Sequence, residues 1–129
     1  MKKVLFIIAL SLFTLNQSQA QTSKTMKQEL KHVVFFKFKP TSSPASIDAI
    51  VKAFNHLYGT IPEVKSLEWG LNISTEQLDQ GFTHCFSLTF SSAKDLAAYQ
   101  IHPAHAAFKT LLPPVMEKAF VVDYFVTPK

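Results

Sequence analysis

The order in which two hydrophobic periods alternate along the chain limits its fold more than any other feature. Apolar residues recur at every second position, the period of a strand, in residues 30–39, 64–73, 82–90 and 119–126. They recur at helical spacing in residues 44–58 and, on either side of a His102-Pro103 turn, in residues 92–112. This order predicts an α+β, ferredoxin-like βαββαβ fold, with a four-stranded antiparallel sheet and helices on one face.

Capping residues mark where the helices begin and end. Ser43 followed by Pro44 predicts the start of the first helix, and Gly59 predicts its end. Ser92 with Asp95 three residues later resembles a capping box and predicts the start of the second. Pro103 biases His102 away from helical angles, so the chain should turn there before a further helical segment.

Alternation assigns each strand two faces. The face predicted to meet the helices carries Leu30, His32, Val34, Phe36, Phe38, Phe82, His84, Phe86, Leu88, Phe90, Val121, Asp123 and Phe125. The opposite face carries Val33, Phe35, Cys85, Val122, Tyr124 and Val126. A sheet face this apolar is costly to leave in water, so we expect a second copy of the chain to cover it, as a homodimer.

The N-terminal region is typical of a secretory signal peptide. Lys2 and Lys3 precede an apolar run, and Ser18-Gln19-Ala20 is a small-x-small cleavage site. We therefore expect residues 1–20 to be a signal peptide, 21–29 a flexible leader and 30–128 the folded domain. The protein would then be exported, periplasmic or secreted, without stable membrane association after cleavage. An uncleaved N-terminal anchor is the alternative.

Charge and cysteine content exclude several functional classes. Cleavage would remove two lysines and leave 11 basic against 9 acidic residues, a net charge of +2. The chain has no arginine, the residue on which nucleic-acid readers usually depend, so we expect no nucleic-acid partner. Cys85 is the only cysteine, so no internal disulfide can form and the thiol should be free.

Four polar side chains occupy positions where the pattern requires apolar ones: His32, His84, His105 and Asp123. Each also has a structural explanation. His32 could hydrogen-bond a loop, His84 could be a satisfied core histidine, and Asp123 could accept backbone N–H bonds or cap a helix. Because burying ionisable groups is costly, several of them converging on one cavity is more indicative of a functional site.

Taken together, these residues favour acid–base chemistry. A histidine oriented by a carboxylate can act as a general base, and a tyrosine hydroxyl can donate to a developing oxyanion. Asp123, His105 and Tyr99 would supply these parts, and we predict that they form one hydrogen-bonded site in a pocket that also exposes His32. The pair His102-x-x-His105 has metal-ligand spacing, but Pro103 disturbs that geometry, and we expect no metal.

Several short motifs resemble those of the stress-responsive α/β barrel domain (Dabb) family, whose members are dimeric ferredoxin-like proteins. The resemblance covers residues 30–128. The most specific motif is the His-Pro-x-His turn within residues 101–105. The others are Lys31-His32-Val33-Val34, Glu68-Trp69-Gly70, Gly81-Phe82-Thr83-His84, Leu88-Thr89-Phe90 and Val122-Asp123-Tyr124.

The resemblance extends to a member that closes a linear polyketide by an intramolecular aldol step without metal or cofactor. It implies that His105 is the base, Asp123 its orienting carboxylate and Tyr99 a hydrogen-bond donor to the substrate. It also implies a dimeric α/β barrel without a cofactor. Five residues would line the substrate pocket: His32, His84, Phe36, Phe54 and Phe86. Phe54 stands where that member has a tyrosine.

Two functions from different classes remain open at this point. The first is a cofactor-independent acid–base enzyme, a cyclase or aldol-type lyase, acting on a small apolar carbonyl compound. The second is a non-catalytic, stress-related protein that binds a small apolar molecule in the same pocket. Haem or metal binding, which occurs in other dimeric ferredoxin-like proteins, is a third class that the sequence favours less.

Overall fold

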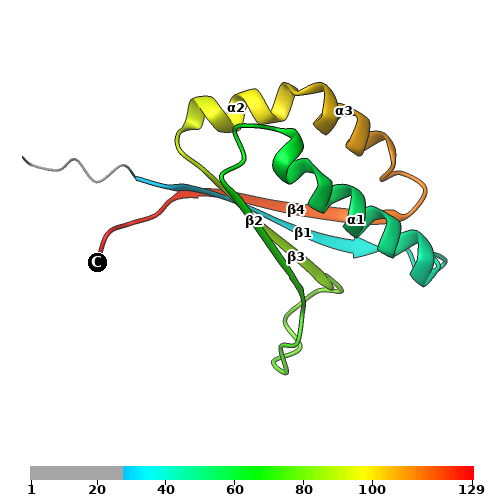
Figure 1. Ribbon diagram of the computed structural model, residues 1–129. Helices are drawn as coiled ribbons and strands as arrows, with labels where there is room; N and C mark the ends of the chain where they lie inside the picture. The colour runs from blue at the N-terminus through cyan, green and yellow to red at the C-terminus, as the bar shows by residue number, and fades with distance from the viewer. Residues whose placement is uncertain (1–27) are drawn as a thin grey trace, which may run out of the picture.

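The structure is a computed structural model that describes residues 28–129 (Figure 1). The predicted signal peptide and all but the last two residues of the predicted leader lie outside the described residues. The predicted order of elements is confirmed, with the second helical segment divided in two. In chain order the elements are β1 (Leu30–Phe38), α1 (Pro44–Thr60), β2 (Ser66–Leu71), β3 (His84–Phe90), α2 (Ala93–Ile101), α3 (Pro103–Thr110) and β4 (Met116–Phe125).

The four strands form one antiparallel sheet in the order β2-β3-β1-β4, and all three helices lie on one of its faces (Figure 1). β1 is an inner strand that pairs with β4 along its whole length and with β3 from Leu30 to Phe36. His32 stands opposite Leu88 on one side and opposite Asp123 on the other. Because directly opposed residues share a face, Asp123 lies on the helix-facing side, as predicted.

The capping residues act as the sequence predicts. Ser43 Oγ accepts from the backbone N–H of Ser46 at 3.1 Å and begins α1. Ser92 Oγ accepts from the N–H of Asp95 at 3.1 Å and begins α2. Regular helical geometry in α1 is lost at Tyr58 and at Gly59, whose φ of 85° favours a residue without a side chain.

The predicted inward orientation of Phe82 is wrong. β3 begins only at His84, and the Phe82 ring lies 6.3 Å from the ring of Phe120. Phe120 is the register partner of Phe35, on the face away from the helices. Gly81 has a φ of 84° and belongs to a turn, so the alternation of β3 does not extend back to Phe82.

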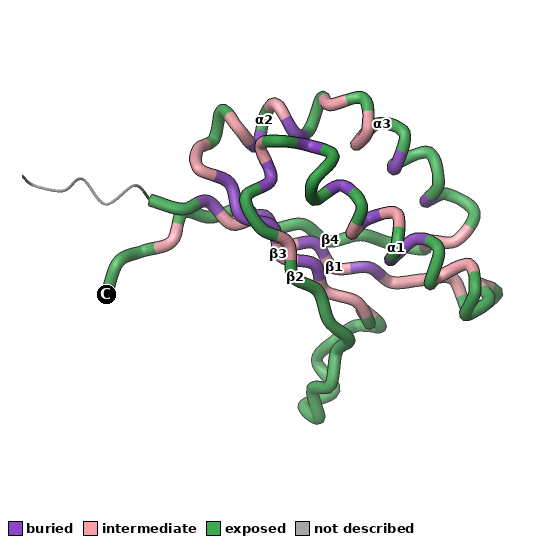
Figure 2. The backbone as a smooth tube through the Cα atoms, in the orientation of Figure 1, coloured by how far each residue is buried: buried purple, intermediate pink, exposed green. Residues whose placement is uncertain are grey.

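The core lies between the sheet and the helices, where Figure 2 shows the buried segments of β1, β3 and the inner helix faces. Its centre is aromatic. Phe54 of α1 lies 4.2 Å from Phe86 and 5.7 Å from Phe36, measured between ring centroids, and Phe108 of α3 stacks edge-on against Phe54 at 4.9 Å. None of these rings is more than 4% exposed. They form one packed cluster that ties α1 and α3 to the sheet.

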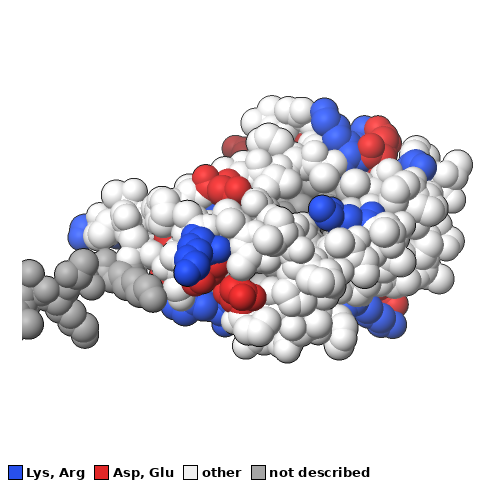
Figure 3. All heavy atoms as spheres, turned by 90° about the horizontal axis from the view of Figure 1, so that it is seen from above, with Lys and Arg blue, Asp and Glu red and all other residues white. Residues whose placement is uncertain are grey.

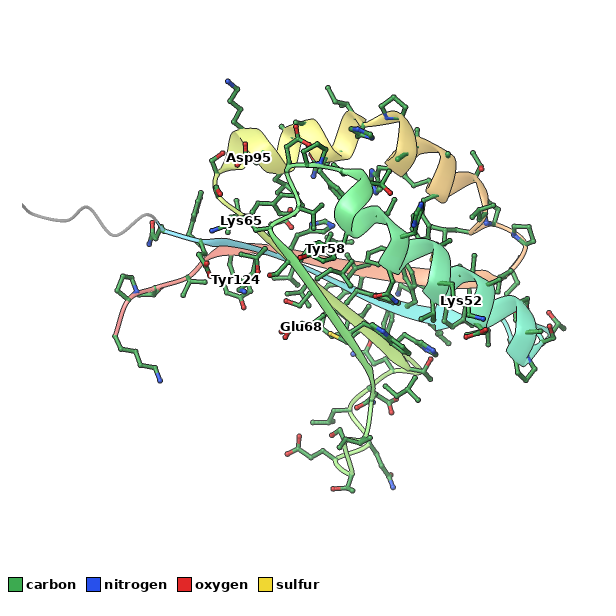
Figure 4. The ribbon with its side chains drawn as sticks, in the orientation of Figure 1. Lys52, Tyr58, Lys65, Glu68, Asp95 and Tyr124 are labelled. Atoms are coloured by element: carbon green, nitrogen blue, oxygen red, sulfur yellow. The ribbon has the colours of Figure 1, made fainter. Side chains whose placement is uncertain are left out.

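The face of the sheet away from the helices is exposed and largely apolar. Phe120, Val122 and Tyr124 of β4 are 54%, 38% and 49% exposed. Tyr124 and Glu68 project on this side, below the sheet in Figure 4. An open groove of about 820 Å³ also lies here, with Phe35, Cys85 and Phe120 on its floor. We call this the open sheet face.

Charged side chains are scattered over the helix layer rather than gathered into one patch (Figure 3). Scattered charges of this kind are typical of a solvated surface. Among residues 28–129, none of the helices is long and apolar enough to cross a membrane.

Candidate functional site

The site is built at the junction of α2 and α3. Pro103 begins α3, and the residue before it, His102, has extended angles (φ −64°, ψ 137°) that end α2, as predicted from the sequence. The break places Tyr99, in the last turn of α2, against His105, in the first turn of α3. Their rings stack with centroids 4.3 Å apart.

The geometry gives His105 the properties of a base. Its Nδ1 lies 3.1 Å from the carbonyl oxygen of Gln100. Because a carbonyl only accepts, Nδ1 carries the proton and Nε2 keeps its lone pair. Burial lowers the pKa of His105, the carbonyl of Gln100 partly offsets this, and Lys109 and His32 lower the pKa further. The imidazole is therefore neutral at neutral pH and can accept a proton at Nε2.

Tyr99 is an unsatisfied donor. The residue is fully buried, and its hydroxyl has no hydrogen-bond partner among the residues that the structure describes. Burial strongly raises the pKa of Tyr99, so the phenol stays protonated. A buried polar group without a partner costs about 1–3 kcal/mol, which makes such groups rare and worth explaining. An oxygen atom of a bound molecule would satisfy this hydroxyl.

His32 and Asp123 form the polar pair of the site. Nδ1 of His32 lies 2.5 Å from Oδ1 of Asp123, so it donates to the carboxylate. The side chain of His32 is 8% exposed and that of Asp123 is 39% exposed, so the pair runs from the core to the surface beside edge strand β4. The His32 ring meets Tyr99 edge-on at 5.7 Å.

The predicted hydrogen bond between Asp123 and His105 is therefore wrong in its partner. Asp123 is the direct register partner of His32, and its carboxylate bonds that ring. His105 is oriented instead by a backbone carbonyl freed at the end of α2. The four side chains are nevertheless connected by contacts. His105 stacks on Tyr99, the Tyr99 ring meets His32 edge-on, and His32 donates to Asp123. Their catalytic roles stay a prediction.

His84 lies apart from this group. It stands opposite Phe36 on β1, four residues along the strand from His32, or about 13 Å. Its Nδ1 lies 2.8 Å from Oγ1 of Thr83, and its ring stacks on Trp69 at 6.2 Å. Burial lowers the pKa of His84. The structure thus separates His84 from the other polar residues that were expected to line one pocket.

Phe36, Phe54 and Phe86 are packed against one another as core residues. That they line a substrate pocket stays a prediction. The aromatic wall that touches the site is Phe90, whose ring lies 5.2 Å from that of Tyr99 and 6.3 Å from that of His32. Alternation in β3 placed Phe90 on the helix-facing side, but nothing in the sequence marked it as a neighbour of the site.

The two histidines with metal-ligand spacing are used differently. Nδ1 of His102 accepts from the backbone N–H of Ala104 at 3.1 Å and so caps α3. Within residues 28–129, no group of three or more histidine, cysteine or acidic side chains is arranged to hold a metal ion. The capping role of His102 was missed from the sequence, although Pro103 at the next position signals a helix start.

Comparison with known proteins identifies the family and the fold of the chain. The family model of the stress responsive A/B barrel domain matches residues 30–126. The stress-response A/B barrel domain-containing protein HS1 of Arabidopsis thaliana is 39% identical over 98 residues, which cover 76% of this chain and 90% of that protein. Olivetolic acid cyclase of Cannabis sativa is 32% identical over 100 residues, which cover 78% of this chain and 97% of that one.

Solved structures show the same fold. Hydroxynitrile lyase from Passiflora edulis superposes with a TM-score of 0.74 at 28% identity, covering 80% of this chain and 97% of that one. A dimeric ferredoxin-like protein from Thermobifida fusca superposes with a TM-score of 0.67 at 20% identity, covering 78% and 93%. The second likeness concerns the fold alone.

Proposed function

This chain belongs to the stress responsive A/B barrel domain family, and from that membership we propose that it is a cofactor-independent acid–base enzyme of the cyclase or lyase type. Its substrate would be a small, mostly apolar carbonyl compound. The names of two similar proteins, a cyclase and a hydroxynitrile lyase, support this class of chemistry. The substrate is inferred from the site itself.

The observation that carries the proposal is the buried, unpartnered hydroxyl of Tyr99 beside a neutral imidazole. A protonated phenol aimed at no acceptor is pre-organised to donate to an oxygen that gains charge during a reaction. The ring of His105 stacks on that of Tyr99 and presents a free Nε2. A donor and a base on two stacked rings are the two groups needed to remove a proton from the carbon beside a carbonyl.

The proposed step uses only these residues. Nε2 of His105 takes the proton from the α-carbon, and the electron pair of the broken C–H bond moves into an enolate. The Tyr99 hydroxyl donates to the enolate oxygen. In a cyclisation, the α-carbon then attacks a second carbonyl of the same molecule, and His105 returns its proton to the new alkoxide. Atoms and charge balance without a cofactor.

The surroundings favour an apolar substrate. Phe90 walls the site on the side of Tyr99 and His32. Beyond it lies the aromatic core, and we propose that Phe36, Phe54 and Phe86 contact the apolar part of the substrate. His32, held by Asp123, is the second polar group that a substrate oxygen would meet.

The test is proton exchange, because it needs no knowledge of the natural substrate. A set of small apolar ketones and β-diketones is incubated in D2O with the protein, and loss of the α-proton signal is followed by NMR. The parent protein should catalyse exchange. His105→Ala should lose it by about 10²–10⁴-fold, the usual contribution of a general base. His56→Ala, a change at an exposed residue of α1, is the matched control and should keep the parent rate.

Two outcomes would overturn the enzymatic proposal. If the ketones bind, seen as shifts in the aromatic NMR signals, but exchange stays at the buffer rate, the protein is a binding module of the same fold. If His105→Ala exchanges protons as fast as the parent, the proposed mechanism fails, because His105 is then not the base.

We further propose a homodimer formed through the open sheet face. Its apolar residues support this, as do dimeric neighbours of the same fold. We also propose export after removal of residues 1–20, which the Lys2-Lys3 start, the apolar run and the Ser18-Gln19-Ala20 site support. Mass spectrometry of the protein recovered from its natural host would show a chain beginning at Gln21, whereas an intact N-terminus would contradict cleavage.

A further inference from the structure

The break between α2 and α3 exchanges backbone partners in an unusual way. In an unbroken helix the N–H of Ala104 would donate to the carbonyl of Gln100, four residues earlier. Here the N–H of Ala104 donates to Nδ1 of His102 at 3.1 Å. The carbonyl of Gln100 is thereby left for Nδ1 of His105, also at 3.1 Å. The His102 ring therefore replaces the helical acceptor of the Ala104 N–H, and the His105 ring replaces the helical donor to the Gln100 carbonyl.

His102 also holds the second residue of the site. Its backbone N–H donates to the carbonyl of Tyr99 at 3.1 Å, a carbonyl that Pro103, without an N–H, could not satisfy. The carbonyl of His102 accepts from Ala106 at 3.0 Å and opens the hydrogen-bond ladder of α3. Three groups of one residue therefore connect the turn that carries Tyr99 to the turn that carries His105.

We propose that His102 is a positioning residue: its neutral imidazole caps α3, holds the Ala104 N–H away from the Gln100 carbonyl, and so keeps that carbonyl free to fix the tautomer of His105. His102 would touch no substrate. The inference about catalysis rests on the proposed function, but the inference about His105 geometry does not.

The proposal gives His102 a role different from metal or acid–base chemistry. Nδ1 can accept from Ala104 only when it carries no proton, so the ring must be the Nε2–H tautomer. A nitrogen engaged in this way cannot bind a metal ion at the same time. Asparagine, which is among the best N-capping residues, offers an acceptor oxygen in place of the ring nitrogen. It should therefore cap α3 as His102 does.

The experiment compares His102→Ala with His102→Asn in protein labelled with ¹⁵N at histidine. In the parent, the His105 signals should show a proton on Nδ1 and a free Nε2. His102→Ala should lose this signature, and its proton-exchange rate on the ketone set should fall by up to about 10²-fold, because small misplacements of a base cost this much. His102→Asn should restore the signature and bring the rate to within about threefold of the parent, since it restores the cap.

Ser43→Ala is the matched control. It removes a cap of the same kind from α1, which carries none of Tyr99, His105, His32 or Asp123. It should weaken α1 and leave the His105 signals unchanged. An unchanged His105 signature in His102→Ala would overturn the proposal. So would a His102→Asn protein that keeps the signature but exchanges as slowly as His102→Ala, because the imidazole would then act chemically. If the parent protein shows no exchange activity, the proposed function fails, and the NMR comparison still tests the positioning role.

Discussion

Asp123 and His32 face each other directly across the β1–β4 pair, with Oδ1 of the carboxylate 2.5 Å from Nδ1 of the ring. The histidine lies in the core, whereas its partner stands on an edge strand and is partly open to solvent. The contact thus connects the surface beside β4 to the buried ring of Tyr99, against which the His32 ring packs.

The first prediction concerns this pair. Asp123→Ala should destabilise the protein by about 1–3 kcal/mol, because a buried imidazole N–H loses its acceptor. In a His32→Phe background the same change should cost less, which gives a coupling of about 0.5–3 kcal/mol for residues in contact. Urea unfolding of the four proteins measures it. The matched cycle of Asp123 with His105 should be additive to within about 0.5 kcal/mol, and a coupling there as large as the first would contradict the pairing described.

Tyr99→Phe should separate stability from activity. Removing a hydroxyl that has no partner should leave the free energy of unfolding unchanged or raise it, because an unpaired buried group is costly. Proton exchange should fall by about 10²–10³-fold if the hydroxyl stabilises an oxyanion. Tyr58→Phe, at a residue that is 52% exposed, should change neither quantity. A marked loss of stability in Tyr99→Phe would show that the hydroxyl has a partner in solution.

Stability should decrease as the solution is acidified. Burial lowers the pKa of His84 and His105 in the folded state below the ordinary value of about 6.5. The unfolded chain then binds protons at a higher pH than the folded chain does. The free energy of unfolding should therefore fall as the pH drops below about 6.5 and level off below the folded-state pKa values. His84→Gln combined with His105→Gln should reduce this slope in urea titrations between pH 7 and 5, while above pH 8 neither protein should show a slope from these groups.

The open sheet face should be the dimer interface. Val122→Lys places a charge in the middle of this face and should yield monomers in light scattering at micromolar concentration, while the parent is a dimer. An obligate interface of this kind often buries more than roughly 2,000 Å² in total. Ile101→Lys makes the same change at an apolar residue of α2 that is 83% exposed, and it should remain dimeric. A monomeric parent protein would refute the interface.

Cys85 should be a free thiol covered by that interface. It lies on the floor of the groove on the open sheet face, and no disulfide partner exists in the chain. Burial and the nearby charge of Glu68 raise the pKa of the thiol, which slows its reaction further. A thiol reagent should label the native dimer slowly and the Val122→Lys protein faster. Equal rates in both would show that the dimer does not cover this residue.

The local chemistry of the chain was sufficient for the elements and for much of the site. The helix caps Ser43 and Ser92 could be predicted because each side chain accepts from a backbone N–H only three positions along the chain. Pro103 ends α2 through a clash with its immediate neighbour. The two-residue period placed His32, Asp123 and Phe90 on the helix-facing side without any knowledge of their partners.

The partners themselves depend on contacts between distant parts of the chain. Asp123 bonds His32 rather than His105 because the register of β1 with β4, shifted once between Lys37 and Phe38, sets them opposite each other. His84 and His32 share a face, but four residues of strand and the aromatic core separate them. Alternation decides only to which side of a sheet a side chain points. Which side chains then meet is decided by strand register and helix packing, which act between residues as many as 91 positions apart, as for His32 and Asp123.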